Sequence, residues 1–168
     1  MWTLARALVY ATGFIGFLLV FLPARILSAS GVARGAGIGV WQIAGAVLTA
    51  IGAAVALWCI LTFVVVGQGT PAPFDAPRRL VVRGPYRFLR NPMYVGAILA
   101  LAGAALYYGS LSLAGYAVVF AFATHAMVVV SEEPALGRLF GAEYEAYRRR
   151  VGRWWPRLAG ARRPTEQV

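Results

Sequence analysis

Four long apolar blocks, separated by short polar stretches, constrain the fold of this chain more than any other feature. The blocks run over residues 4–21, 40–66, 92–108 and 111–130. A helix needs about 20 apolar residues to cross the hydrocarbon core of a bilayer. Since the blocks reach or approach this length, we predict an all-α integral membrane bundle of about four transmembrane helices and a cytosolic C-terminal amphipathic helix.

Composition supports this fold class and excludes several kinds of site. Hydrophobic residues make up 60% of the 168 residues and charged residues 13%, whereas soluble domains contain roughly 25% charged residues. The length fits a single domain. The one cysteine, Cys59, and the one histidine, His125, lie far apart in apolar blocks. An internal disulfide and a zinc-type cluster are therefore excluded, and His125 is interpreted as a buried, hydrogen-bonded group.

The positive charge is arranged as an orientation signal. All 16 basic residues are arginines, and the formal net charge is +10. Five arginines lie in the loop 67–90 and eight follow the fourth block, whereas the linker after the first block has two. Arginines concentrate on the cytosolic side of membrane proteins, so both termini and the loop are predicted to be cytosolic, in the inner or plasma membrane. Because the arginines do not share one helix face, nucleic acid is not expected as a partner.

Proline and glycine predict where the helices begin and end. Pro23 is expected to end the first block, which fits a retained helix better than a signal peptide because no clean cleavage site follows it. Gly84 and Pro85 form a turn signal. Pro92 suits the first turn of a helix, where its missing N–H costs nothing. Gly109 begins a tight turn, which makes the third and fourth blocks an antiparallel hairpin.

Small residues in the second block indicate close helix packing. In lipid, such residues allow two helix backbones to approach each other. They are Gly45, Ala46, Thr49, Gly52, Ala53 and Ala56.

The region after the fourth block is predicted to be a separate amphipathic helix. Residues 131–134 are expected to end the apolar region. From residue 135 to 151, one helical face is apolar; it carries Leu136, Phe140, Tyr144, Tyr147 and Val151. Tyr144 and Tyr147 are interpreted as packing residues. Trp154 and Trp155 are typical of an interfacial anchor, and residues 157–168 are expected to be a tail.

The predicted topology brings two polar stretches to the cytosolic membrane boundary. One is the loop with Tyr86, Arg90 and Asn91, and the other is the acidic pair Glu132 and Glu133. Arginine can hold a carboxylate, glutamate can hold an ammonium or ribose hydroxyls, and tyrosine can face a cation or a base. S-adenosylmethionine carries a carboxylate, an ammonium group, ribose hydroxyls, a cationic centre and a base, and other zwitterions carry some of these groups. The alternative for the first stretch is a basic juxtamembrane loop without a ligand. The alternative for Glu132 and Glu133 is an acidic cap at the start of the C-terminal helix.

The spacing of these residues resembles a known group of enzymes. The pattern G-P-Y-R-x-x-R-N-P-M-Y-x-G is followed by the hairpin and by E-E-x-x-L-x-x-x-F-G-x-E-Y-x-x-Y-x-x-x-V. Together they resemble the isoprenylcysteine carboxyl methyltransferase and phospholipid methyltransferase group, over roughly residues 68–156. The resemblance implies a membrane-embedded enzyme that uses S-adenosylmethionine and takes a lipophilic substrate from the bilayer.

The resemblance also implies a cofactor site. Carried over by position, this site consists of Gln68, Arg78, Arg79, Leu80, Val81, Tyr86, Asn91, Pro92, Met93, Tyr94 and Glu132. The spacing of Gln68 is longer here than in the group. Asn91 stands where the prenylcysteine enzymes have histidine. Val128, four residues before Glu132, stands where they have a substrate-linked arginine, which weakens the case for a prenylcysteine carboxylate as the acceptor.

We therefore predict an integral membrane methyltransferase in one domain, 1–168. Residues 1–66 form two N-terminal spans, 67–156 the cofactor loop, hairpin and C-terminal helix, and 157–168 the tail. Glu133 is the candidate base for an amine or thiol acceptor, and Arg90 is the second candidate catalytic residue. The alternative is a non-enzymatic small membrane protein that serves as an assembly or transport subunit.

Overall fold

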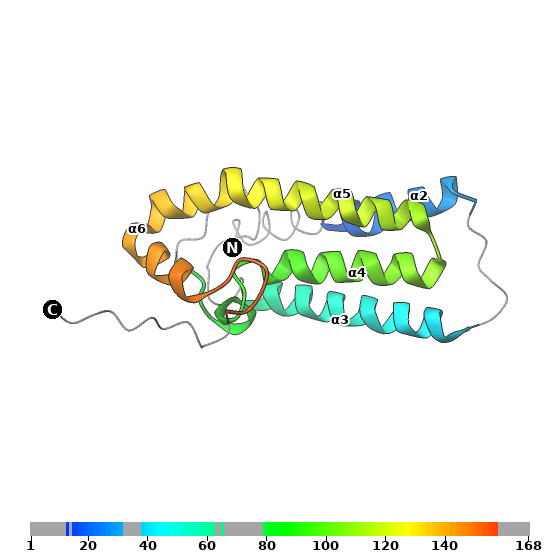
Figure 1. Ribbon diagram of the computed structural model, residues 1–168, viewed down its shortest axis with the longest axis horizontal. Coiled ribbons are helices and arrows are strands. Elements are labelled where there is room, and N and C mark those ends of the chain that lie inside the picture. Colours follow the sequence, from blue (N-terminus) through cyan, green and yellow to red (C-terminus); the bar gives the residue numbers. More distant parts are fainter. Residues whose placement is uncertain (1–12, 14, 32–37, 63–64, 66–78, 158–168) are drawn as a thin grey trace.

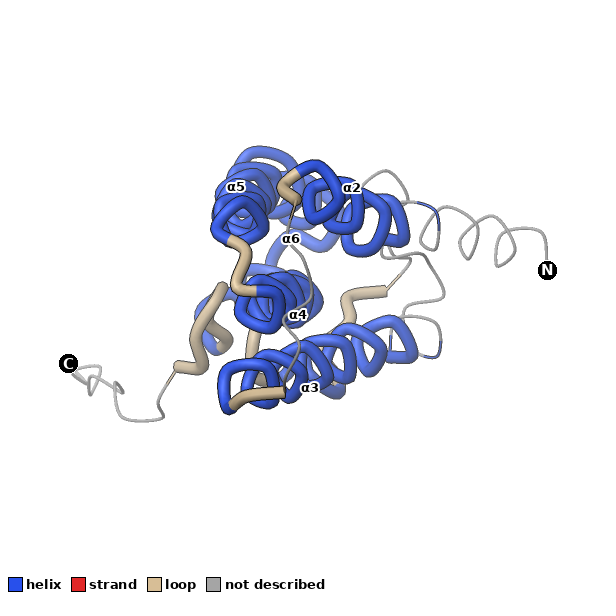
Figure 2. Tube along the Cα trace, turned by 90° about the vertical axis from the view of Figure 1, so that its right-hand side faces the viewer, coloured by secondary structure: helices blue, strands red, loops and turns tan. Residues whose placement is uncertain are grey.

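The chain folds into a helical bundle, and no strand forms in the part that the structure describes. The computed structural model describes residues 13, 15–31, 38–62, 65 and 79–157. The helices are α2 (Leu22–Ala29, after a π-helical turn at Phe17–Phe21), α3 (Val40–Thr62), α4 (Pro92–Tyr108), α5 (Leu111–Met127) and α6 (Glu133–Arg150). α4 lies between α3 and α5, and α2 lies beside α5 (Figures 1 and 2). The all-α fold class is confirmed.

Two of the described helices are long and apolar enough to cross a membrane. α3 has 23 residues, and α5 continues into α6 as a helix of 40 residues. Only 17% and 22% of their most apolar windows are buried, so both helices expose apolar surface that a core helix of a soluble protein would bury. α4 and the segment Phe17–Ala29 are shorter apolar helices. The arrangement of four spans stays a prediction.

Glycine allows the backbones of α3 and α4 to touch. A Cβ atom at Gly52 would lie 2.5 Å from the Gly96 carbonyl oxygen and 2.5 Å from the Ala100 nitrogen. A Cβ atom at Gly103 would lie 2.5 Å from the Thr49 nitrogen. No side chain fits at such distances, so these positions accept only glycine if the two helices are to keep their separation.

The small residues of α3 divide between two faces of the helix. Gly45, Gly52 and Cys59 recur every two turns and are buried, as expected for one contact face. Ala46 and Ala53, each one residue further on, are exposed. The predicted packing role is therefore confirmed for the glycines and wrong for these two alanines, which the rotation of the helix turns away from α4.

The hairpin between α4 and α5 forms as predicted. α4 begins at Pro92 and ends with Gly109 in the left-handed conformation, at φ 59°. Ser110 then caps α5, because its hydroxyl accepts a hydrogen bond from the Leu113 N–H at 3.2 Å. Glycine at the end of one helix and serine at the start of the next explain why the chain reverses within two residues.

Two prolines lie inside continuous helices, where the sequence predicted breaks. Before Pro23, the N–H of Leu22 bonds to the carbonyl of Phe17, five residues back. A second π-helical turn, at residues 128–132, precedes Pro134 in the same way that the turn Phe17–Phe21 precedes Pro23. The wider turn accommodates a residue that lacks an N–H and whose ring crowds the preceding carbonyls. The helices therefore continue, so the predicted end at Pro23 is wrong.

The fourth apolar block likewise continues through the π-helical turn 128–132 into α6 without a break at Pro134, and the interruption comes later, at Gly141. The helix bends at Gly141, whose φ of 49° and ψ of −122° are not helical. The bend turns the apolar face predicted for residues 135–151 toward the loop after α3. The resulting tyrosine cluster contains Tyr144, Tyr147, Val151, Leu80, Leu136 and Phe140.

Candidate functional site

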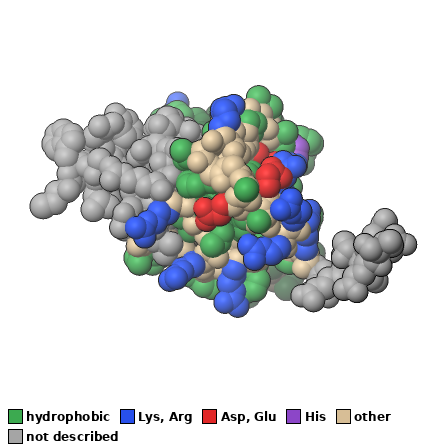
Figure 3. Space-filling view, turned by 90° about the vertical axis from the view of Figure 1, so that its left-hand side faces the viewer, with side chains coloured by type: hydrophobic (Ala, Val, Ile, Leu, Met, Phe, Trp, Pro, Cys, Tyr) green, Lys and Arg blue, Asp and Glu red, His purple; other side chains and the backbone are tan. Residues whose placement is uncertain are grey.

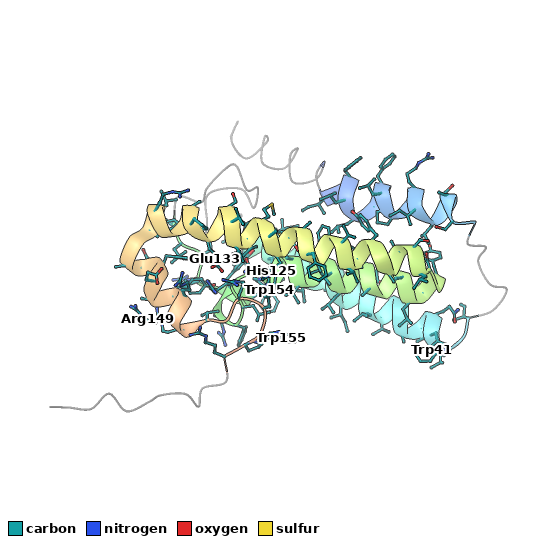
Figure 4. The ribbon with its side chains drawn as sticks, turned by 45° about the horizontal axis from the view of Figure 1, so that its top comes forward. Trp41, His125, Glu133, Arg149, Trp154 and Trp155 are labelled. Carbon is teal, nitrogen blue, oxygen red and sulfur yellow. The ribbon has the colours of Figure 1, made fainter. Side chains whose placement is uncertain are left out.

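Three stretches that are distant in sequence meet at one end of the bundle. They are the loop 79–91, the α5–α6 junction and the turn 151–157 that follows α6. Figure 1 shows the loop in green and the turn in orange to red, together at the left. In Figure 4, Glu133, His125 and Trp154 lie close together at this end, whereas Trp41 lies at the opposite end.

A short 3₁₀ turn, Gly84–Arg87, seats the loop against α3. Gly84 has a φ of 57°, and a Cβ atom there would lie 2.8 Å from the Thr62 hydroxyl oxygen. Both facts require glycine. The turn places Tyr86 beside Cys59, where it is 7% exposed. Burial is the main cause that raises the pKa of Tyr86, and the nearby Cys59 raises it further. The Tyr86 hydroxyl therefore stays protonated.

Glu133 lies at the centre of an ion-pair network. Arg153 donates to both of its oxygens, from Nε to Oε1 at 2.6 Å and from Nη2 to Oε2 at 2.9 Å. Arg90 Nη1 lies 2.9 Å from the same Oε1, and the side chains of Arg90 and Glu133 are only 8% and 10% exposed. The hydrogen bond to Glu133 raises the pKa of Arg153. A carboxylate held by two guanidinium groups is stabilised in its ionised form and is a poor proton acceptor.

Arg90 has one buried donor that the described residues leave unused. Its Nη1 donates to the Tyr144 hydroxyl at 3.2 Å as well as pairing with Glu133. Its Nε is buried and has no hydrogen-bond partner among the described side chains and backbone. A buried donor without a partner costs about 1–3 kcal/mol. Nε of Arg90 is therefore a donor with unused hydrogen-bonding capacity inside this end of the bundle.

Tyr94 and Glu132 form a second polar pair beside this network. Tyr94, in the first turn of α4, donates its hydroxyl hydrogen to Oε1 of Glu132. Both residues are partly buried. No described residue hydrogen-bonds to Oε2 of Glu132, and no arginine pairs with it within the described ranges. No side chain hydrogen-bonds to the backbone at the start of α6, so the two glutamates do not form a hydrogen-bonded helix cap.

The turn after α6 is fastened to the loop through its backbone. The N–H of Arg90 donates to the carbonyl of Gly152 at 2.9 Å. Asn91 Nδ2 donates to the carbonyl of Arg153 at 3.4 Å. The turn requires glycine, because a Cβ atom at Gly152 would lie 1.9 Å from the Trp155 carbonyl oxygen.

His125 joins the same turn to α5. Its Nδ1 accepts a hydrogen bond from Trp154 Nε1 at 3.0 Å. The predicted hydrogen-bonded state of His125 is confirmed, but its predicted burial is wrong, because the side chain is exposed. The neighbouring Thr124 takes the buried position on this part of α5. Trp155 is 82% exposed, and its role as a membrane anchor stays a prediction.

The predicted site residues fall into four groups. Those with polar contacts across the site are Arg90, Asn91, Tyr94, Glu132 and Glu133. Those that are buried or pack against an apolar cluster are Leu80, Val81, Tyr86, Pro92 and Met93, whereas Arg79 is exposed. Gln68 and Arg78 lie outside the described residues.

The sequence did not single out Arg153, and it assigned Tyr144 and Tyr147 to packing alone. Both tyrosines are buried, which confirms the packing, but Tyr147 also donates to the Tyr86 carbonyl at 2.6 Å. Arg153 is one of several arginines near the end of the chain. Its contact with Glu133 depends on the bend at Gly141, which sequence periodicity does not reveal.

Arginine dominates the surface at this end of the bundle. Figure 3 shows basic side chains around the face, with smaller acidic patches between them. The exposed arginines of the loop, of α6 and of the turn are Arg79, Arg83, Arg87, Arg138, Arg148, Arg149, Arg150 and Arg157. The prediction that this end faces the cytosol rests on this concentration of arginines.

Comparison with known proteins gives one match. The sequence model of a family described as phospholipid methyltransferase matches residues 40–143. No curated protein and no solved structure matches the chain. The matched residues include α3, the described part of the loop, the hairpin and both glutamates.

Proposed function

Because the chain belongs to the phospholipid methyltransferase family, we propose that it is an integral membrane methyltransferase that uses S-adenosylmethionine and acts on a lipophilic or amphipathic acceptor. One observation supports this most strongly. The Tyr94–Glu132 pair and the unused donor of Arg90 come together at one end of an apolar bundle. A polar site beside apolar helices suits an enzyme whose donor is polar and whose acceptor is lipophilic.

The polar groups at this end fit the amino-acid part of the donor. Arg90 Nε would hold the carboxylate, since an arginine is an effective partner for a carboxylate. Glu132, with its Oε2 free of described partners, would hold the ammonium group or the ribose hydroxyls. Tyr94 fixes the orientation of the Glu132 carboxylate through the hydrogen bond from its hydroxyl. Bound S-adenosylmethionine supplies an electrophilic methyl group on a sulfonium centre.

Catalysis by this chain would consist mainly of orientation and exclusion of water. Tyr86, Tyr144 and Tyr147 are buried beneath the site, and they fix the loop to α6. Holding donor and acceptor in line accounts for a large part of the rate enhancement in a displacement of this kind. A site closed to water also prevents hydration of the nucleophile.

The ion pairs favour a structural role for Glu133 over that of a base. Its carboxylate is 10% exposed and is engaged by Arg90 and Arg153. An acceptor that must lose a proton would therefore lose it to another group or to water, as long as both arginines remain in place. A carboxylate acceptor would need no base.

The acceptor is proposed to be neutral or cationic, such as a lipid amine or an apolar thiol. Val128 is fully buried in the π-helical turn before Glu132, and it provides no cation for a carboxylate. An unpaired carboxylate near lipid is costly. The test offers N-acetyl-farnesylcysteine, amine and thiol acceptors to the purified protein with labelled S-adenosylmethionine. Fastest transfer to the prenylcysteine would contradict this choice of acceptor.

The site and both termini are proposed to be cytosolic, with four spans. Trp155 and Trp41 lie at opposite ends of the bundle and are 82% and 67% exposed (Figure 4). In a protein with Cys59 replaced by serine, Trp155→Cys should react with an impermeant thiol reagent only after the cytosolic side is opened. Trp41→Cys should react from outside. Labelling of Trp155→Cys in intact cells would contradict the topology.

Transfer of the labelled methyl group into any extracted lipid or offered acceptor separates an enzyme from a non-enzymatic subunit. Glu132→Ala serves as the matched inactive control. Equal incorporation by the wild-type protein and this variant would show that the assigned site does not carry the reaction.

A further inference from the structure

Arg153 lies outside the residues that match the family, yet both its guanidinium group and its backbone carbonyl contact residues of the site. The match ends at residue 143. The guanidinium group of Arg153 holds both oxygens of Glu133, and its carbonyl accepts from Asn91. Thus a residue from the turn after α6 touches two residues of the matched region.

The geometry around Glu133 is asymmetric. Oε1 is shared between Arg153 Nε and Arg90 Nη1, whereas Oε2 bonds to Arg153. Arg90 therefore meets the carboxylate at a single nitrogen, and its Nε keeps no protein partner among the described residues. A carboxylate that is free to choose tends to bind a guanidinium group through both oxygens. Arg153 prevents Glu133 from binding Arg90 in this way.

We propose that Arg153 is a positioning residue that keeps Glu133 from pairing with Nε of Arg90, so that this donor stays unpaired and available to the carboxylate of a bound amino-acid ligand. This inference rests on the proposed function, since it assigns that carboxylate to the methyl donor. Arg153 does not touch the reacting atoms. It acts through Glu133, and the fixed backbone of the turn at Gly152 holds it in place.

Loss of Arg153 then has a specific consequence. In Arg153→Ala, Glu133 is free to turn and to occupy the Nε side of Arg90, where it competes with the ligand. Adding Glu133→Gln to that variant removes the competing charge and leaves a ligand carboxylate as the counterion of Arg90. A role of Arg153 in folding alone predicts the reverse, because the second substitution removes one more polar contact.

The first arm of the test uses the protein without ligand. Protein labelled with ¹⁵N-arginine in detergent micelles gives an Arg90 Nε–H signal, assigned by its loss in Arg90→Lys. The signal should shift in Arg153→Ala and return toward its wild-type position in Arg153→Ala/Glu133→Gln. Arg148→Ala is the matched control, because Arg148 is exposed and its pair with Glu145 spans 3.5 Å at the surface. An unmoved signal in Arg153→Ala would overturn the inference.

The second arm measures S-adenosylhomocysteine affinity by calorimetry. Arg153→Ala should weaken binding roughly tenfold, the equivalent of about 1.4 kcal/mol, and the double variant should recover most of the loss. Arg148→Ala should bind as the wild-type protein does. Failure of the double variant to recover would overturn the positioning role. A wild-type protein that shows the expected NMR pattern but binds no S-adenosylhomocysteine would support the positioning role and overturn the proposed donor instead.

Discussion

The α3–α4 interface and the site end are held together by opposite means. Between α3 and α4, glycine at positions such as Gly52 and Gly96 lets backbone touch backbone, and Thr49 adds one hydrogen bond from its hydroxyl to the Ala100 carbonyl at 3.4 Å. At the site end, the loop, the α5–α6 junction and the last turn are joined by charges, with Glu133 between Arg90 and Arg153. Contact between α3 and α4 requires glycine, which has no side chain. Contact at the site end requires the long polar side chains of glutamate and arginine.

The difference shows how an apolar bundle can present a polar site without losing its shape. Helix packing in lipid gains nothing from the hydrophobic effect between helices, so close contact must stabilise α3 against α4. At the site end, the charges of Arg90, Glu133 and Arg153 are tolerated because each one is paired. A change at the site end should therefore act through unpaired charge, and a change at the interface through steric overlap.

The largest expected effect is the loss of Glu133. Glu133→Ala leaves Arg90, whose side chain is 8% exposed, without its carboxylate, and breaking a buried pair in this way costs about 3–5 kcal/mol. Glu145→Ala is the control, because the Glu145–Arg148 pair is exposed at the surface and such pairs contribute about 0–1 kcal/mol. The free energy of unfolding in detergent measures both. Equal losses in the two variants would show that burial of the network does not matter.

A smaller loss is expected where the helices touch. Gly52→Ala places a Cβ atom 2.5 Å from backbone atoms of α4, and overpacking of this kind costs about 1–3 kcal/mol. Gly115→Ala makes the same substitution in α5, where nothing lies within 4 Å of the new atom. It should be neutral or stabilise by up to about 1 kcal/mol, since alanine favours helix. Thermal unfolding of both variants tests this, and a tolerated Gly52→Ala would contradict the close packing.

The smallest effect concerns a single neutral hydrogen bond. Tyr147→Phe removes the bond to the Tyr86 carbonyl at 2.6 Å and should cost about 1 kcal/mol. Tyr108→Phe is the control, because the structure gives the Tyr108 hydroxyl no hydrogen bond among the described residues. If both variants unfold at the same temperature as the wild-type protein, the Tyr147 hydroxyl does not help to hold the loop on α6.

The two regions also differ in how far the sequence predicts them. The hairpin, the start of α4 at Pro92 and the glycine contacts follow from local signals, because length, proline position and small residues act within one or two helices. The π-helical turns before Pro23 and Pro134 carry no such signal, since proline ordinarily breaks a helix. The Arg153–Glu133 pair was missed because it joins residues 20 positions apart through a bend at Gly141.

The central claim is that the end of the bundle with Tyr94 and Glu132 binds the methyl donor. Calorimetry with S-adenosylhomocysteine on the detergent-solubilised protein tests it most directly, with Glu132→Ala and Tyr94→Phe as variants and Arg148→Ala as control. We expect the wild-type protein and the control to bind. Each site variant should lose about 1.5–3 kcal/mol of binding free energy through a charged hydrogen bond while it stays folded. Unchanged affinity in both site variants, or no binding by the wild-type protein, would contradict the claim.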